Sequence, residues 1–437
     1  MPDHMEPGPR RLSPAQLPIW YAEMLHRNTS RWTQVTVATL HGPIDPDRME
    51  EAIRAAVAYY PALRTRISLE VREPRQVFTA AEGVPVERHD LTVARELTVA
   101  QGVKQQVLVA NFIIAAASHR FRLYDSALFW ADILVLGPED TVLVFRLHHM
   151  AADGIALALV MKRIAACYRG ELDGLEVETS RTYEQWLDRQ DQEVPALEAA
   201  LAFYGEELAG ATVRYDTLYD GPEAAQECHE PPDLPESTCT LDAEAGGRLK
   251  QLAATNRATP FIVLFAAYAT MLAAVVGSPD LVINTFVSGR SGEAEDLVGM
   301  CINTMLVRLR LGDHATAAEL IGAVREAWRP VRRFQSVPLL SLCQASGGTV
   351  PSTAQFAINY LDMAQASFDL PGVVSQVTHA QQGFPLNDVL FYVLREQDGR
   401  LRMRLISGTG TPRLSRTRLD AMLAEIVRIL QSWFPTA

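Results

Sequence analysis

Hydrophobic and polar positions change period along the first part of the chain, and the changes predict alternating helices and strands. Residues 14–25 have the pattern of a short helix, and residues 35–40 alternate as a strand does. Apolar positions recur at helical spacing over 45–60, after Asp45 as a candidate N-cap. Residues 63–69 return to a strand pattern. The order predicts a mixed α/β fold.

A β-hairpin followed by a helix is predicted near the middle of the first half. Residues 127–136 and 141–147 are apolar, and the Gly-Pro-Glu-Asp turn signal at 137–140 separates them. Residues 155–168 then have the pattern of a helix. Strand, loop and helix therefore follow one another across residues 141–168.

The second half repeats the α/β rhythm. The longest apolar run, 261–276, is shorter than the roughly 20 residues that a membrane span needs. Thr259-Pro260 opens it and Gly277 closes it, so we expect a buried helix. The pattern predicts further helices over 182–208, 243–256 and 414–434, and strands over 281–287, 356–360, 389–394 and 401–406.

Two lobes are expected, because 437 residues exceed one ordinary hydrophobic core. The polar passage 171–180 is a candidate boundary, which gives lobes of residues 1–178 and 179–437. Residues 210–237 are rich in Pro, Glu, Asp and Gly without periodicity, so we expect a long surface loop or linker there.

Charge and cysteine content narrow the class of protein. The net charge of −12 argues against a nucleic-acid partner, since phosphate contacts need a basic face. The five cysteines are odd in number and lack CxxC spacing, which favours reduced thiols in the cytoplasm. Residues 1–11 lack the apolar core of a secretory signal. We therefore expect a cytoplasmic protein with no membrane partner.

The most informative stretch is His148-His149-Met150-Ala151-Ala152-Asp153-Gly154, directly after the apolar strand pattern. An imidazole titrates near neutral pH, so it can accept a proton from an amine or an alcohol. A strand end holds such a group rigidly. We interpret His149 as the general base, and His148 as its buried supporting neighbour, because successive strand residues point to opposite faces. A core histidine bonded to backbone is the alternative for His149.

Asp153 and Gly154 have several interpretations. Asp153 fits a second base, the partner of a structural ion pair, or the N-cap of the helix that follows. We favour a structural role, in which an arginine holds the carboxylate and the loop that presents His149. Gly154 would allow an unusual backbone angle or the close approach of substrate.

Other motifs of catalysis or ligand binding are absent from the sequence. Adjacent histidines suit two ligands of one metal ion poorly, and no HExxH or CxxC companion exists, so we expect no metal. No GxGxxG, Walker or GxSxG pattern is present, which disfavours nucleotide-binding folds and serine hydrolases.

The chain resembles condensation domains of nonribosomal peptide synthesis, in the chloramphenicol-acetyltransferase-like acyltransferase superfamily. The HHxxxDG motif is intact at 148–154, and the SxAQxxxW pattern matches Ser13 to Trp20. Further matches in family order are Leu63 to Arg66, Thr182 to Trp186, Gly289-Arg290, Val298 to Arg308, and Gln335 to Pro338.

The resemblance implies two acetyltransferase-like lobes in a V, with a tunnel between them. His149 would face the tunnel. The motif aspartate, here Asp153, would pair with an arginine, for which Arg64 is the candidate. Asn303 and Ser288 would line the substrate tunnel. No cofactor is expected to be bound, because the carrier-protein partner supplies the phosphopantetheine.

Three functions remain open. The first is a free-standing enzyme, or a domain excised from a larger synthetase, that joins a carrier-bound acyl or aminoacyl thioester to a small amine or alcohol acceptor. The product would be an amide or an ester. The second is an O- or N-acyltransferase of the same superfamily that uses acyl-coenzyme A. The third is a catalytically silent protein that docks carriers, which the intact histidine motif disfavours.

Overall fold

The computed structural model describes most of the chain. The described residues are 8–25, 30–69, 73–92, 101–171, 179–190, 194–219, 234–290, 296–312, 316–362, 368–382, 387–408 and 414–434. The expectations for residues 1–7, for the boundary segment 172–178 and for most of the predicted loop at 220–233 lie outside them.

The chain divides into two compact units, each assembled from several segments. Unit 1 comprises Met1–Gln192, Arg290–Ile302 and Ala366–Gly383, and unit 2 comprises Glu193–Gly289, Asn303–Gln365 and Phe384–Ala437. Two short segments of the second half, Arg290–Ile302 and Ala366–Gly383, therefore belong to unit 1. The predicted lobe boundary at 178/179 adjoins residues outside the description, and it stays a prediction.

The main sheet of unit 1 has the strand order β12-β2-β7-β6-β5. Its strands are β2 (Thr33–His41), β5 (Val86–Asp90), β6 (Phe129–Gly137), β7 (Asp140–His148) and β12 (Val374–Gln382). β6 and β7 pair antiparallel across the 137–140 turn, which confirms the predicted hairpin. β5 joins β6 in parallel, and β12 pairs antiparallel with β2.

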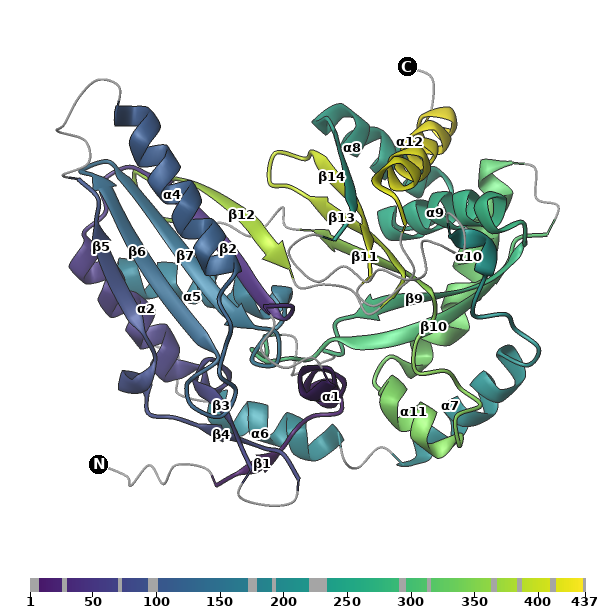
Figure 1. Cartoon of the computed structure of the whole chain (residues 1–437), viewed down its shortest axis with the longest axis horizontal. Coiled ribbons are helices and arrows are strands. Elements are labelled where there is room, and N and C mark those ends of the chain that lie inside the picture. The colour runs from purple at the N-terminus through teal and green to yellow at the C-terminus, as the bar shows by residue number, and fades with distance from the viewer. Residues whose placement is uncertain are drawn as a thin grey trace. The chain divides into compact units, whose positions relative to one another are not determined.

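Helices cover both faces of this sheet (Figure 1). α2 (Pro46–Tyr59) contacts β5, β6 and α5 (Gly154–Arg169). α4 (Gln101–Ala117) covers the other face, where it contacts β2 and β7. The alternating valines of β2 and β7 form an apolar layer beneath α4, and Phe112 of α4 packs against it. The predicted helix after Asp45 is confirmed, since the Asp45 carboxylate caps α2.

A small sheet and two helices complete the described part of unit 1. The sheet order is β1-β4-β3, and the 3₁₀ turn η1 leads into β3. α1 begins three residues later than predicted, after the turn closed by Ser13 and Gln16. The bounds are β1 (Arg10–Arg11), α1 (Leu17–Leu25), η1 (Pro61–Arg64), β3 (Thr65–Ser68), β4 (Arg75–Phe78), η2 (Ala81–Gly83) and α6 (Thr179–Gln190).

Unit 2 is built on a six-stranded sheet of order β10-β9-β11-β13-β14-β8. β11 pairs in parallel with both β9 and β13, and the other pairs are antiparallel. The bounds are β8 (Glu236–Leu241), β9 (Asp280–Val287), β10 (Asn303–Arg310), β11 (Phe356–Asp362), β13 (Val389–Arg395) and β14 (Leu401–Ser407). Four predicted strands, at 281, 356, 389 and 401, are thereby confirmed.

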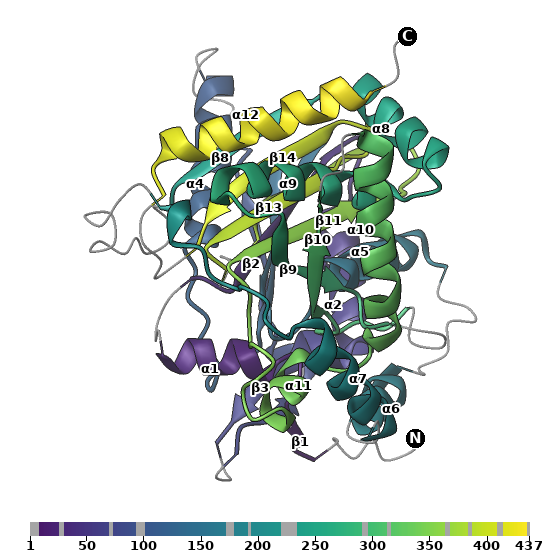
Figure 2. The same cartoon turned by 90° about the vertical axis from the view of Figure 1, so that its right-hand side faces the viewer.

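A buried helix organises the core of unit 2. α9 (Pro260–Val276) begins at the predicted cap Thr259 and ends at Gly277, whose φ is +69°. It contacts α8, α10 and α12, and Figure 2 shows α12 lying along the same side of the sheet. The other helices of unit 2 are α7 (Val194–Glu207), η3 (Asp216–Leu218), α8 (Ala243–Thr255), α10 (Ala317–Val331), η6 (Arg332–Phe334), α11 (Leu339–Ala345) and α12 (Arg416–Trp433).

The helix expected over 182–208 is described in two parts, α6 and α7. The residues between them, 191–193, lie outside the description, so the continuity of this helix stays a prediction. Among the described residues, no lone helix is both long and apolar enough to cross a membrane. α8 and α9 reach the necessary length and composition only as a pair, which bends by 95°.

Candidate active site

The end of β7 fixes the backbone of the two motif histidines. His148 is the last residue of β7 and lies opposite Thr33 of β2. Its N–H donates to Leu128 O at 2.9 Å, and the N–H of His149 donates to Trp32 O at 2.8 Å. Both neighbouring strands therefore hold the backbone at the point where the loop begins.

His149 presents one ring nitrogen as a proton acceptor. Its Nδ1 lies 3.2 Å from Ala152 O, and a carbonyl oxygen can only accept, so Nδ1 carries the proton. The lone pair is then on Nε2. The ring is partly buried, with its centroid 6.1 Å from that of Trp32. Burial lowers the pKa of His149 below 6.5, although Asp153 and the Ala152 carbonyl oppose the shift. The imidazole is therefore neutral near pH 7 and able to act as a base.

His148 has different neighbours and the opposite tautomer. Its side chain is buried, 3% exposed, and Nδ1 accepts the N–H of Met150 at 3.2 Å. Nε2 consequently carries the proton, and it lies 3.6 Å from Oε1 of Glu23. The Phe121 ring contacts it edge to face. This placement agrees with the supporting role expected for His148.

Asp153 joins the loop, the following helix and a distant segment of the chain. It caps α5, because its Oδ1 accepts Ala156 N–H at 2.9 Å. Both its oxygens receive the Arg290 guanidinium, each at 2.9 Å, and Oδ2 also accepts Cys301 N–H at 3.1 Å. Asp153 is fully buried. The carboxylate is thus saturated, which supports a structural role.

The expected pairing of Asp153 with Arg64 is wrong. Arg290 takes that position, and Arg64 instead donates from NH1 to Thr79 O at 2.7 Å. Arg64 ends η1, so its backbone leads its side chain toward β4 rather than toward the loop. Any further role of Arg64 in the active site stays a prediction.

Gly154 is the first residue of α5, and its φ is not positive. The expected unusual backbone angle is therefore wrong, because the helix starts at this residue with ordinary geometry. The other expectation, that Gly154 admits substrate closely, stays a prediction.

A second set of buried residues, which the sequence did not identify as a network, surrounds Asp153. The Tyr183 hydroxyl donates to Oε1 of Gln76 at 3.4 Å, and Nε2 of Gln16 reaches the same oxygen at 3.2 Å. The Tyr183 ring lies against Gly299, where an added Cβ would come within 2.4 Å of it. The family patterns at Gln16, Tyr183 and Gly299 marked three of these positions, but nothing in the sequence marked Gln76.

Asn303 and Ser288 belong to unit 2. Asn303 begins β10, and its amide donates to Gln335 O at 3.0 Å and Val337 O at 2.7 Å while Oδ1 accepts Leu339 N–H at 3.3 Å. Its amide therefore ties β10 to the segment that precedes α11. Ser288 directly follows β9 and is partly exposed. Their place in a substrate tunnel stays a prediction.

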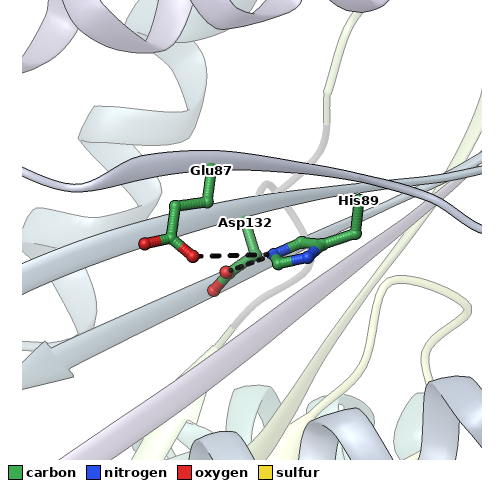
Figure 3. A group of neighbouring side chains, drawn as sticks. All are labelled: Glu87, His89 and Asp132. Carbon is green, nitrogen blue, oxygen red and sulfur yellow. Dashed lines mark hydrogen bonds and ion pairs between the residues drawn. The ribbon is translucent and has the colours of Figure 1, made fainter.

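One group of side chains in unit 1 has the composition of a metal site, namely Glu87, His89 and Asp132 (Figure 3). Nε2 of His89 lies 3.0 Å from Oδ1 of Asp132 and 3.9 Å from Glu87. The second oxygen of Asp132 accepts from Arg146 at 2.6 Å. Since the buried carboxylate already has a cation and an imidazole as partners, ion pairing accounts for the group, and we assign no metal to it.

The described cysteines offer no activated nucleophile beside His149. Cys301 is buried, and burial raises the pKa of its thiol well above the usual range, although Arg290 opposes the shift. A thiol in this state is unreactive. Cys301 is therefore no candidate nucleophile at this site.

Two α/β units, a histidine with an acceptor nitrogen and a buried aspartate paired with an arginine agree with the acyltransferase class that the sequence motif indicated. The family profile described as "Condensation domain" matches residues 9–387, and the chain belongs to this family. Condensation domains are acyltransferases that form amide or ester bonds from carrier-tethered substrates.

Relatives at the sequence level are parts of large synthetases. The chain is 29% identical over 337 residues to one polypeptide of the linear gramicidin synthase of Brevibacillus parabrevis, and the match covers 76% of this chain and 4% of that protein. It is 28% identical over 450 residues to a probable non-canonical nonribosomal peptide synthetase of Salinispora arenicola. That match covers 98% of this chain and 6% of that protein. The chain thus spans a small part of these relatives.

Solved structures share the fold over nearly the whole chain. The first condensation domain of the calcium-dependent antibiotic synthetase, in complex with a substrate analogue, has a TM-score of 0.77 at 20% identity and covers 97% of this chain and 95% of that one. The condensation domain of the Monacolin K polyketide synthase has a TM-score of 0.79 at 17% identity, with 98% of each chain covered.

Proposed function

We propose that this chain is a cytoplasmic enzyme that condenses a carrier-bound acyl or aminoacyl thioester with a small amine or alcohol. The phosphopantetheine arm belongs to the carrier protein and enters as part of the substrate. His149 serves as the general base. Membership of the family gives the reaction class, and the geometry of His149 supports its assignment as the general base.

The observation that carries the role of His149 is its tautomer. The Ala152 carbonyl holds the proton on Nδ1, so Nε2 is an acceptor before any substrate arrives. The lowered pKa keeps this acceptor unprotonated at neutral pH. No reorganisation is then needed before the nucleophile gives up its proton.

The bond changes follow from this arrangement. The nitrogen or oxygen of the acceptor attacks the thioester carbonyl carbon, and Nε2 of His149 takes its proton as the tetrahedral intermediate forms. The intermediate collapses when the carbon–sulfur bond breaks. The leaving thiolate receives the proton from the imidazolium, which restores the neutral base. Asp153 and Arg290 hold the loop through these steps and do not exchange protons.

A second donor calls for a direct test because of one structural relative. The starter condensation domain of rhizomide synthetase, solved in complex with C8-CoA, has a TM-score of 0.77 at 20% identity and covers 97% of this chain and 94% of that one. Coenzyme A carries the same phosphopantetheine thioester as a carrier protein does. The alternative function is therefore acyl transfer directly from acyl-coenzyme A.

The test offers identical acyl and aminoacyl groups on an acyl carrier protein and on coenzyme A, with a panel of amines and alcohols. Products are detected by mass spectrometry. We expect an amide or ester from the carrier-bound donor, and a roughly 10²- to 10⁴-fold lower rate for His149→Ala. The matched control is His41→Ala, since His41 is an exposed histidine that pairs with Asp140 at the surface.

The outcomes separate the hypotheses. Equal or faster product formation from coenzyme A would overturn the carrier-dependent proposal. Undiminished turnover by His149→Ala would overturn the general-base role. No product from any donor, with the protein folded, would favour the catalytically silent carrier-docking protein.

A further inference from the structure

The backbone of Met150, the residue directly after His149, is tied to the α1 region through both of its polar groups. Its carbonyl oxygen accepts from Nε2 of Gln16 at 2.8 Å. Its N–H donates to Nδ1 of His148 at 3.2 Å, and Nε2 of that imidazole lies 3.6 Å from Glu23. Two separate connections therefore run from the turn after His149 to one short helical segment.

Gln16 and Glu23 lie on one face of that segment. They are seven residues apart, which is close to two helical turns. Gln16 is fully buried and Glu23 is 7% exposed, whereas Tyr21 and Leu25 of the same helix are 47% and 80% exposed. The segment thus turns its two long polar side chains inward, toward the histidine loop, and leaves Tyr21 and Leu25 more exposed.

Glu23 and His148 bring together two buried polar atoms. Oε1 of Glu23 and Nε2 of His148 have no hydrogen-bond partner in the described part of the chain, and the 3.6 Å between them is a close polar contact that is longer than a hydrogen bond. A buried carboxylate oxygen without compensation is costly. The protonated Nε2 of His148 directs a dipole at this oxygen, and the carboxylate favours that tautomer.

We propose that Glu23 is a positioning residue for the reaction. It holds the proton of His148 on Nε2, which leaves Nδ1 free to accept the N–H of Met150 and so fixes the turn that carries His149. With Nδ1 protonated instead, His148 and Met150 would present two donors to each other. The inference rests on the proposed role of His149 as the base.

The first test compares Glu23→Ala, Glu23→Gln and wild type in the condensation assay. We expect Glu23→Ala to lower kcat by roughly 10- to 100-fold with little change in KM, because misplacement of the base affects the chemical step more than binding. Glu23→Gln should recover most of the rate, since its amide oxygen also presents an acceptor to Nε2–H. Glu51→Ala is the matched control, an exposed glutamate of α2.

A spectroscopic readout reports the tautomer itself. Nitrogen-15 spectra of histidine-labelled protein, with the His148 signal assigned by its loss in His148→Asn, should show the proton on Nε2 in wild type and in Glu23→Gln. In Glu23→Ala we expect the Nδ1–H form to appear. The wild-type spectrum tests the proposal even where a variant fails to fold.

Failure of the Glu23 proposal can be told apart from failure of the proposed function. Loss of turnover in His149→Ala together with full kcat in Glu23→Ala would overturn the positioning role and leave the base intact. A wild-type His148 that carries its proton on Nδ1 would overturn it as well. Undiminished turnover in His149→Ala would instead remove the proposed function on which the inference rests.

Discussion

His148 and His149 are adjacent in the chain but carry their protons on opposite ring nitrogens. Met150 N–H donates to Nδ1 of His148, whereas Nδ1 of His149 donates to Ala152 O. One imidazole therefore directs its N–H at a buried carboxylate, and the other keeps an acceptor nitrogen for chemistry. The backbone of the loop sets both tautomers, since both hydrogen bonds are to main-chain atoms.

The pH dependence of turnover should show an acidic limb below pH 6.5. Burial lowers the pKa of His149 from its ordinary 6.5, so the base stays deprotonated down to that pH. We expect kcat/KM to be level near neutrality and to fall only in more acidic solution. The measurement is the pH–rate profile with a carrier-bound donor, and a limb centred above 6.5 would contradict the assignment.

The same shift affects stability with a defined sign. The unfolded chain binds a proton at His149 at a higher pH than the folded chain does, so the free energy of unfolding falls as pH drops below 6.5. We expect His149→Gln to weaken this acid dependence. Urea titrations at pH 7 and pH 5.5 measure the difference between the variant and wild type, and an unchanged difference would count against the lowered pKa.

Asp153→Asn should destabilise unit 1 by about 3–5 kcal/mol, because it leaves the Arg290 guanidinium buried without its counter-charge. The asparagine keeps the helix cap, so the loss reports the ion pair together with the hydrogen bond from Cys301 N–H. The matched control is Asp45→Asn, which changes the exposed cap of α2 in the same chemical way and should cost less than about 1 kcal/mol. Denaturant unfolding measures the free energy of unfolding of both variants. An equal loss in Asp153→Asn and Asp45→Asn would refute a dominant ion pair.

Gly299→Ala should destabilise the protein by about 1–3 kcal/mol and lower the rate of condensation. The added Cβ would meet the buried Tyr183 ring at 2.4 Å, and the Gly299 carbonyl also accepts from Arg290 at 3.2 Å. Gly322→Ala, in α10 with open space around its Cβ, is the control and should be neutral or slightly stabilising. Tolerance of alanine at Gly299 would show that Tyr183 can move.

Cys301 should resist alkylation in the folded protein. Its thiol is buried with a strongly raised pKa, whereas Cys343 of α11 is partly exposed. We expect maleimide to label Cys343 first and Cys301 only after unfolding, as measured by peptide mass spectrometry. Rapid labelling of Cys301 with a parallel loss of turnover would reopen the covalent mechanism.

Local patterns predicted the elements that present the histidines. The hairpin of β6 and β7 and the cap at Asp153 follow from signals within a few residues, as do the ends of α9. The Arg290 partner was missed because it lies 137 residues from Asp153, and Arg64 followed the aligned family motif instead. Gln76 is a buried polar residue in a short strand, and only the folded structure reveals that it joins Gln16 and Tyr183.

The strand β12 was also missed, since Val-Ser-Gln-Val-Thr-His-Ala-Gln-Gln has little apolar character. It is the outermost strand of its sheet and pairs with β2 alone, so it needs fewer hydrophobic residues than a central strand does. The sequence therefore predicted most central strands but missed the polar edge strand β12. It also missed β10, in which Leu306 and Val307 are buried.

The pairing of β12 with β2 has a consequence for biosynthesis. The hydroxyl of Thr36 contacts the ring of His379, 343 residues later in the chain. Before the ribosome has made residues 374–382, β2 is the outer strand, and its unpaired amides and carbonyls are open to pairing with other chains. The sheet that bears the His148-His149 loop is consequently among the first parts to be synthesised and among the last to be completed.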